Sequence, residues 1–237
     1  MIEFFNLILL INILPNLTWI NLIKYILVNQ YNKIMLNSLR PYLTKFLEPL
    51  ASRLNINPNI VTVISPFLAI ISALFFASGN LIGGALFILL SGFLDVLDGA
   101  VARRHDRASP FGAFLDSTMD RFADAIIFIG IIFGGYCHWF VGVLAIHSAI
   151  TVSYVRARAE SQGVECNIGI AERAVRMIIL MLGAVIAAIF HSNIIFTYFI
   201  YILVILSYFT VGQRILHVWK ALNGPKVQRQ KRLRQKL

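Results

Sequence analysis

Long apolar runs separated by short polar intervals dominate the chain from residue 60 onward. A transmembrane helix needs about 20 apolar residues to cross the roughly 30 Å hydrocarbon core of a bilayer. Six runs meet this requirement, and they cover approximately residues 60–78, 81–98, 113–134, 137–157, 174–191 and 194–212. The pattern therefore predicts an all-α integral membrane protein, built as a six-transmembrane-helix bundle.

Residues 36–54, ahead of the first run, have a different pattern. Apolar residues recur there at helical spacing with Arg and Lys among them, and Pro41 and Pro49 interrupt the periodicity. Such a pattern is typical of amphipathic helices that lie in the plane of the membrane interface. We therefore expect residues 35–56 to form an N-terminal interfacial amphipathic segment.

The first 34 residues are apolar but are broken up by several asparagines and a proline. We treat residues 1–34 as an N-terminal extension. It is a peripheral segment, a seventh span, or an upstream stretch if Met35 is the working start. Residues 57–216 then form the six-helix domain, and residues 217–237 form a basic tail.

Basic residues are distributed unevenly over the predicted loops. The loops at 79–80, 135–136 and 192–193 contain no Lys or Arg, whereas the alternate loops and the C-terminal end contain several. Cytoplasmic loops of membrane proteins carry an excess of Lys and Arg. The distribution predicts a multi-pass protein of the cell membrane, with both termini and the aspartate-containing end of the bundle facing the cytoplasm.

The composition agrees with a membrane protein, since 58% of the 237 residues are hydrophobic and 14% are charged. The net charge of +10 reflects 21 basic and 11 acidic residues, and much of it lies at 226–236. A basic cluster beside a span is attracted to anionic headgroups by about 1 kcal/mol per residue. RNA binding is the alternative for this tail, but we expect the lipid bilayer as its partner and no nucleic acid.

Four aspartates interrupt the second and third runs, namely Asp95, Asp98, Asp116 and Asp120. Ionisable residues inside membrane spans are functional-site hypotheses by default, because an unpaired charge there is costly. The first two are three residues apart and the last two are four apart, so each pair shares one face of a helix. Carboxylates from two helices predict a cage for one or two hard divalent cations. A structural polar cluster or an ion pathway is the alternative.

These aspartates belong to a longer pattern, Asp-x2-Asp-Gly-x2-Ala-Arg-x8-Gly-x3-Asp-x3-Asp. The chain resembles the CDP-alcohol phosphatidyltransferase family, whose signature has the same residues at the same gaps. The resemblance covers roughly residues 36–215. The matching positions are Asp95, Asp98, Gly99, Ala102, Arg103, Gly112, Asp116 and Asp120.

The resemblance implies that the four aspartates hold two Mg²⁺ or Mn²⁺ ions, which grip the diphosphate of a CDP-linked lipid. Asp120 is implied to act also as the general base that takes the proton of the attacking alcohol, with release of CMP. Asp124, one turn further on, lies outside the pattern, and we expect it to support the ligands from behind or to be a structural acid, rather than to be a ligand itself. The residues implied to bind the CDP-lipid are Pro58, Thr62, Asp98, Gly99, Arg103 and Ser109.

A second set of polar residues stands at the ends of the last three spans. Arginines that converge from three helices suit a phosphate dianion, because guanidinium groups bind phosphate bidentately. The segments 153–160 and 169–176 resemble the inositol-phosphate branch of the family, although Arg156 and Ala174 stand where bacterial relatives often have Lys and Pro. This resemblance implies inositol 1-phosphate as the acceptor. Its implied ligands are Ser153, Arg156, Arg176 and Arg214.

Several alternatives stay open. For each arginine the alternative role is anchoring at the membrane surface. Glycerol 3-phosphate or serine are alternative acceptors, and the lipid is CDP-diacylglycerol or CDP-archaeol, since apolar spans would contact both alike. A membrane prenyltransferase also binds a diphosphate through aspartates, but with different spacing. A divalent-cation transporter would explain the carboxylates, although spans five and six offer few polar groups toward the outer side. The resemblance further implies a homodimer.

Overall fold

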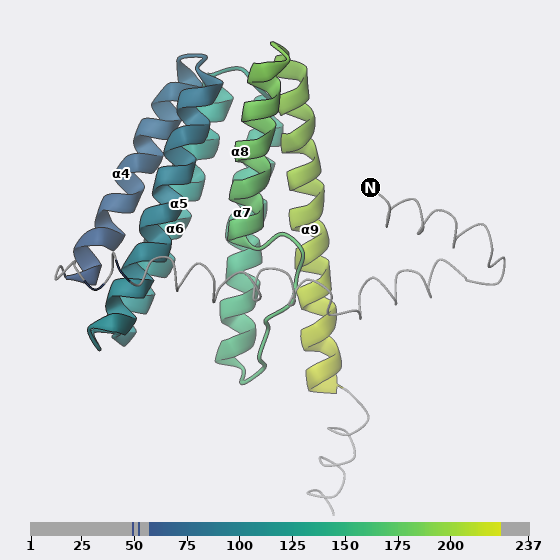
Figure 1. Cartoon of the computed structure of the whole chain (residues 1–237). Helices are drawn as coiled ribbons and strands as arrows, with labels where there is room; N and C mark the ends of the chain where they lie inside the picture. The colour runs from purple at the N-terminus through teal and green to yellow at the C-terminus, as the bar shows by residue number, and fades with distance from the viewer. Residues whose placement is uncertain (1–48, 50–51, 53–56, 224–237) are drawn as a thin grey trace, which may run out of the picture.

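A computed structural model of the protein describes residues 49, 52 and 57–223 (Figure 1). Within these ranges every regular element is helical. The helices of residues 57–223 are α4 (Pro58–Ala77), α5 (Leu81–Arg104), α6 (Pro110–Phe133), α7 (Trp139–Ser161), α8 (Arg173–Ile189) and α9 (Asn193–Asn223). The all-helical fold predicted from the apolar runs is confirmed.

Local polar residues determine where α4 and α6 begin. The side chain of Asn57 accepts a 3.0 Å hydrogen bond from a backbone N–H of the first turn of α4, and Pro58 follows it. Ser109 accepts a 3.0 Å hydrogen bond in the same way at the start of α6, ahead of Pro110. An N-cap side chain followed by proline is a favourable helix start. The second start places Asp116 and Asp120 within about three turns of the N-terminus of α6.

Four helices are long and apolar enough to cross a membrane by length and composition, namely α4, α5, α7 and α9. The other two differ for separate reasons. α6 has 24 residues but carries Asp116, Asp120, Arg121 and Asp124, and α8 has only 17 residues. The structure therefore agrees with a multi-pass membrane protein, and the count of six spans stays a prediction.

Helix packing brings the aspartate-bearing helices to common partners. α4 packs along both α5 and α6, while α8 packs against α5 and α9, and α7 packs against α6 and α9. α4 and α6 approach so closely at Gly130 that a Cβ atom there would clash with the backbone of Ala73. Small residues commonly allow membrane helices to approach in this way. Buried Phe76, Phe128 and Phe196 belong to the apolar core that joins the bundle.

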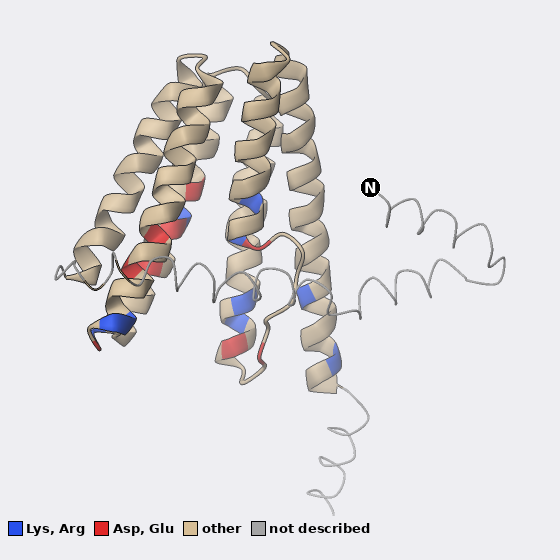
Figure 2. Cartoon of the chain, viewed as in Figure 1, with Lys and Arg blue, Asp and Glu red and all other residues tan. Residues whose placement is uncertain are grey.

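Charged residues among 57–223 run from the bottom of the bundle to about its mid-height in the view (Figure 2). This part contains the C-terminal part of α5 and the N-terminal part of α6, and α8 begins near its upper limit. The opposite end contains the turns at 78–80, 134–138 and 190–192, and no Lys, Arg, Asp or Glu lies there among residues 57–223. All the polar candidates for the site are therefore gathered at the same end.

α9 extends beyond the predicted boundary at residue 216 and ends at Asn223. Nothing in 217–223 breaks a helix, and the first Gly-Pro pair follows at 224–225. The beginning of the predicted tail is therefore helical. The predicted extension 1–34, most of the interfacial segment and residues 224–237 lie outside the described residues.

Candidate active site

Three of the four predicted metal ligands converge. Asp95 of α5 meets Asp116 and Asp120 of α6, and one carboxylate oxygen of each lies within 4.8 Å of the others. All three residues are half-buried. Hard divalent cations such as Mg²⁺ and Mn²⁺ prefer oxygen ligands, carboxylates above all. The donor set of this group therefore fits such a cation.

Asp98, the fourth predicted ligand, lies outside this group of three. Its residue is only 6% exposed, and its carboxylate accepts a 2.6 Å hydrogen bond from the Thr62 hydroxyl. Because Thr62 belongs to α4, this bond connects the aspartate motif of α5 to the neighbouring helix. The role of Asp98 as a metal ligand stays a prediction.

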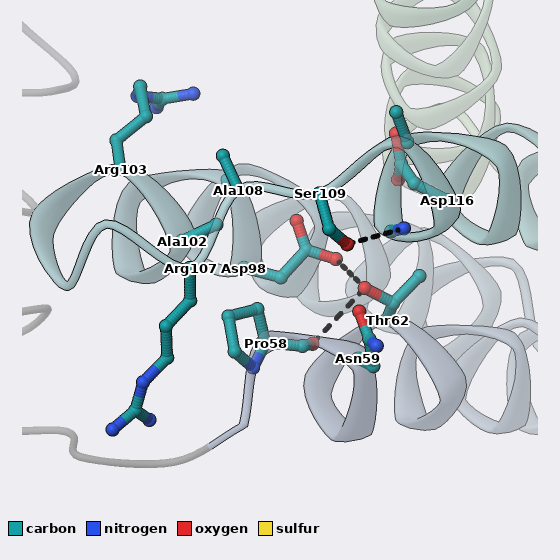
Figure 3. A pocket seen from close by; sticks show the side chains of 13 residues that line it. Pro58, Asn59, Thr62, Asp98, Ala102, Arg103, Arg107, Ala108, Ser109 and Asp116 are labelled. Carbon is teal, nitrogen blue, oxygen red and sulfur yellow. Dashed lines mark hydrogen bonds between the residues drawn. The ribbon is translucent and has the colours of Figure 1, made fainter.

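A cavity of about 190 Å³ adjoins the carboxylates (Figure 3). It forms where the starts of α4 and α6 meet the end of α5. All of the residues predicted to bind the CDP-lipid line it, namely Pro58, Thr62, Asp98, Gly99, Arg103 and Ser109. Asp116 belongs both to this cavity and to the carboxylate group, so the two are continuous.

The mouth of the cavity offers groups that suit a diphosphate. Arg103 lies at the end of α5, and Ser109 and Gly112 at the start of α6 line the same cavity. Helix N-termini and guanidinium groups both favour phosphate. A Cβ atom on Gly99 would lie only 3.1 Å from Nη1 of Arg103. The glycine therefore leaves room for this guanidinium beside the α5 backbone.

Arg173, at the start of α8, forms ion pairs with the carboxylate group. Its Nη1 is 2.9 Å from Oδ2 of Asp95 and 2.7 Å from Oδ1 of Asp120. Its Nε donates a 3.2 Å hydrogen bond to Oδ1 of Asp124. Sequence reasoning grouped Arg173 with the arginines at the ends of the last three spans and did not place it among the carboxylates. The available signal was its position three residues before Arg176, which puts both on one face of α8.

A sequence profile of the CDP-alcohol phosphatidyltransferase family matches residues 55–217. This range is more than half of the chain, and it contains the whole aspartate motif and the cavity around it. The chain belongs to the CDP-alcohol phosphatidyltransferase family. Enzymes of this family use divalent metal ions, which agrees with the donor set described above.

Named relatives and solved structures extend this assignment. The chain is 47% identical over 191 residues to archaetidylinositol phosphate synthase of Methanothermobacter thermautotrophicus, covering 81% of this chain and 97% of that one. It is 33% identical over 186 residues to phosphatidylinositol phosphate synthase of Mycobacteroides abscessus, covering 74% and 84%. The crystal structure of Mycobacterium tuberculosis phosphatidylinositol phosphate synthase with CDP-DAG bound matches with a TM-score of 0.68 and 29% identity, covering 74% and 94%. Its complex with manganese and citrate matches with a TM-score of 0.67 and 30% identity, covering 73% and 88%.

Arg176 of this transferase is buried and bound within the protein. It is 1% exposed, and its Nη2 donates a 2.7 Å hydrogen bond to Oδ2 of Asp124. Its Nη1 donates to the carbonyl of Ala171 at 2.9 Å, while its Nε has no hydrogen-bond partner among the described residues. Asp124 thus joins α6 to α8 by two ion pairs, as expected of a structural acid.

Arg214 and Arg156, the other predicted acceptor arginines, also contact protein groups. Arg214 of α9 is 2% exposed. It donates to the carbonyl of Ile168 at 2.8 Å and to that of Val152. Arg156 of α7 is more open and pairs with Glu160 at 2.9 Å. Ser153 is half-buried on the same helix. Their assignment to the acceptor stays a prediction.

The loop between α7 and α8 is held against α9 from several sides. Besides Arg214, the Thr210 hydroxyl accepts a 2.9 Å hydrogen bond from the backbone N–H of Ala171. Cys166 of this loop is fully buried, and burial raises the pKa of its thiol although Arg214 and Arg156 lie nearby and oppose the shift. The loop is therefore packed beside Arg214 and Arg156, two of the predicted acceptor arginines.

Proposed function

We propose that this enzyme transfers the phosphatidyl or archaetidyl group of a CDP-linked lipid to inositol 1-phosphate and releases CMP. The observation that carries the proposal is the continuity of the cavity with the carboxylate group through Asp116. A nucleotide in the cavity would place its diphosphate beside the carboxylates. The bound CDP-DAG of the mycobacterial neighbour and the names of the relatives support the same substrate class.

The carboxylates would hold the cofactor. Asp95, Asp116 and Asp120, with Asp98 as the proposed fourth ligand, would bind two Mg²⁺ or Mn²⁺ ions. When bound, such ions neutralise charge on the diphosphate and on the departing CMP. A carboxylate at Asp120 can accept a proton from an acceptor hydroxyl held beside it.

The bond changes follow from this placement. The acceptor oxygen attacks the phosphorus that carries the lipid, and its proton goes to Asp120. The bond from that phosphorus to the bridging oxygen breaks, and CMP leaves with this oxygen. Asp120→Asn should therefore retain CDP-lipid binding but lose turnover. Equal loss of CDP-lipid binding and of turnover would indicate that Asp120 is a metal ligand and not the general base.

The cavity residues are proposed to bind the nucleotide end. Pro58 and Thr62 would contact the nucleotide from α4, and Gly99 would let it lie against the α5 backbone. Arg103 and Ser109 would contact the diphosphate. The support is that all of these residues line one cavity next to the carboxylates.

Ser153, Arg156, Arg176 and Arg214 are proposed to bind the acceptor. Because Arg176 and Arg214 hydrogen-bond to protein groups, they would have to exchange or share these contacts with the acceptor phosphate. Glycerol 3-phosphate and serine are the competing acceptors. The support for inositol 1-phosphate is the names of relatives that match most of this chain.

We further propose that the charged end of the bundle faces the cytoplasm and that the enzyme is a homodimer. The orientation rests on the excess of Arg and Lys at that end. A cation transporter is disfavoured, because the other end has no charged side chain among residues 57–223 to line a path.

A panel of acceptors tests the proposal. The purified full chain in nanodiscs would receive CDP-diacylglycerol or CDP-archaeol, Mg²⁺ or Mn²⁺, and one of four alcohols: inositol 1-phosphate, free inositol, glycerol 3-phosphate or serine. We expect CMP release and a new phospholipid with inositol 1-phosphate, and little with free inositol. Equal or better turnover with glycerol 3-phosphate would overturn the acceptor assignment and leave the transferase class.

A further inference from the structure

Arg173 provides the positive charge closest to the carboxylate group. Three carboxylates within 4.8 Å of one another repel strongly when all are ionised. A single nitrogen of Arg173, Nη1, contacts two of them, Asp95 and Asp120, from opposite helices. It therefore lies between Asp95 of α5 and Asp120 of α6.

A divalent cation and this guanidinium compete for the same place. A cation held by Asp95 and Asp120 would lie close to the present position of Nη1, and two positive charges at such a distance repel each other. We propose that Arg173 is a displaceable counter-ion that occupies the cation position before metal binding and leaves it when the cation binds. This inference rests on the proposed metal site.

Asp124 provides the pivot for this movement. It binds Nε of Arg173 through Oδ1 and Arg176 through Oδ2, and it does not belong to the convergent group of three. Nη1 can therefore leave Asp95 and Asp120 while Nε stays on Asp124. Buried Arg176 holds Asp124 in place. Arg173 is thus a positioning residue for the metal ligands.

Mn²⁺ binding without any substrate tests the proposal directly. Free Mn²⁺ would be titrated by electron paramagnetic resonance against the purified, metal-free full chain in nanodiscs. Arg173→Met should bind Mn²⁺ about 10-fold more tightly than the wild type, because a competing charge is removed. Arg173→Lys keeps the charge and should stay close to the wild type. Arg158→Met, an exposed arginine near the end of α7, is the matched control and should not change the affinity.

Thermal unfolding separates this role from a merely structural one. Without metal, Arg173→Met should melt below the wild type, because the carboxylates repel one another. With saturating Mn²⁺, the Tm deficit should become smaller, because the cation has replaced Nη1 in the wild type and only the ion pair of Arg173 with Asp124 is still missing in the variant. A deficit of equal size with and without Mn²⁺, or unchanged Mn²⁺ affinity, would overturn the proposal. Arg173→Gln provides a second neutral variant if the methionine variant does not fold.

Asp95→Asn separates the proposed metal site from the counter-ion role of Arg173. It should lose most Mn²⁺ binding if the carboxylate group is the metal site. Loss in Asp95→Asn with unchanged affinity in Arg173→Met overturns the counter-ion role alone. Wild-type affinity in Asp95→Asn would overturn the proposed metal site and the counter-ion role together.

Discussion

The cavity side and the arginine side of the site are built differently. On the cavity side, residues of α4, α5 and α6 line an open space, and the Thr62 hydroxyl on α4 donates a hydrogen bond to Asp98 on α5. On the arginine side, Arg176 and Arg214 are buried and bound to a carboxylate or to backbone carbonyls. The cavity is therefore preformed, whereas a ligand of the arginines must replace or share contacts within the protein. The affinity of such a ligand reflects only the free energy that its own contacts provide beyond that of the protein contacts it replaces.

The residue that belongs to both the cavity and the carboxylate group should show the largest effect. Asp116→Asn is expected to lower kcat about 1000-fold or more, because the lost charge weakens the hold on the cation and on the diphosphate together. CMP release at saturating Mg²⁺ measures this. Asp106→Asn, in an exposed loop, is the matched control. Near-normal turnover of Asp116→Asn would show that the carboxylate group is not part of the catalytic centre.

The internal ion pairs of the arginine side can be broken at Asp124. Asp124→Asn should lower the free energy of unfolding by about 3 kcal/mol, because Arg176 stays buried with its charge uncompensated. Thermal unfolding in nanodiscs, again with Asp106→Asn for comparison, provides the measurement. If Tm does not change, the ion pairs do not hold this side together.

Arg156 is the most open of the predicted acceptor arginines and tests the same side with less risk to folding. Arg156→Ala should raise KM for inositol 1-phosphate about 10-fold, at the lower end for a charged hydrogen bond, since the side chain already pairs with Glu160. KM for the CDP-lipid should not change, and Arg158→Ala serves as control. A rise in KM for the lipid instead would place Arg156 on the cavity side.

The smallest effect is expected at the hydrogen bond between Thr62 and Asp98. Thr62→Ala should raise KM for the CDP-lipid about 5-fold, because Asp98 loses one hydrogen bond worth about 1 kcal/mol. Thr62→Ser keeps the hydroxyl and should behave like the wild type, with KM for the acceptor unchanged in both. An equal loss in the serine variant would indicate that the methyl group matters and not the hydrogen bond.

The two sides also differ in how well they could be predicted. The cavity residues come from segments whose spacing and caps are local properties of the chain, and all of the predicted lipid-binding residues line one cavity. The structural role of Asp124 was predicted, but its partners were not. The place of Arg173 at the carboxylates was missed, because an arginine at a helix start is equally typical of anchoring at the membrane surface. Its contacts with Asp95 and Asp120 depend on how α8 packs against the other helices.

The sequence by itself determined the helical class, the starts of α4 and α6 and the pairing of aspartates on two helices. These depend on apolar run length, on capping residues and on helical periodicity, all of which act within a few turns of chain. Only the tertiary structure decided that Asp95 converges with Asp116 and Asp120 while Asp98 pairs with Thr62. It also decided that Arg173 lies among the carboxylates. These contacts join residues far apart in sequence, so they depend on the rotation and close approach of whole helices.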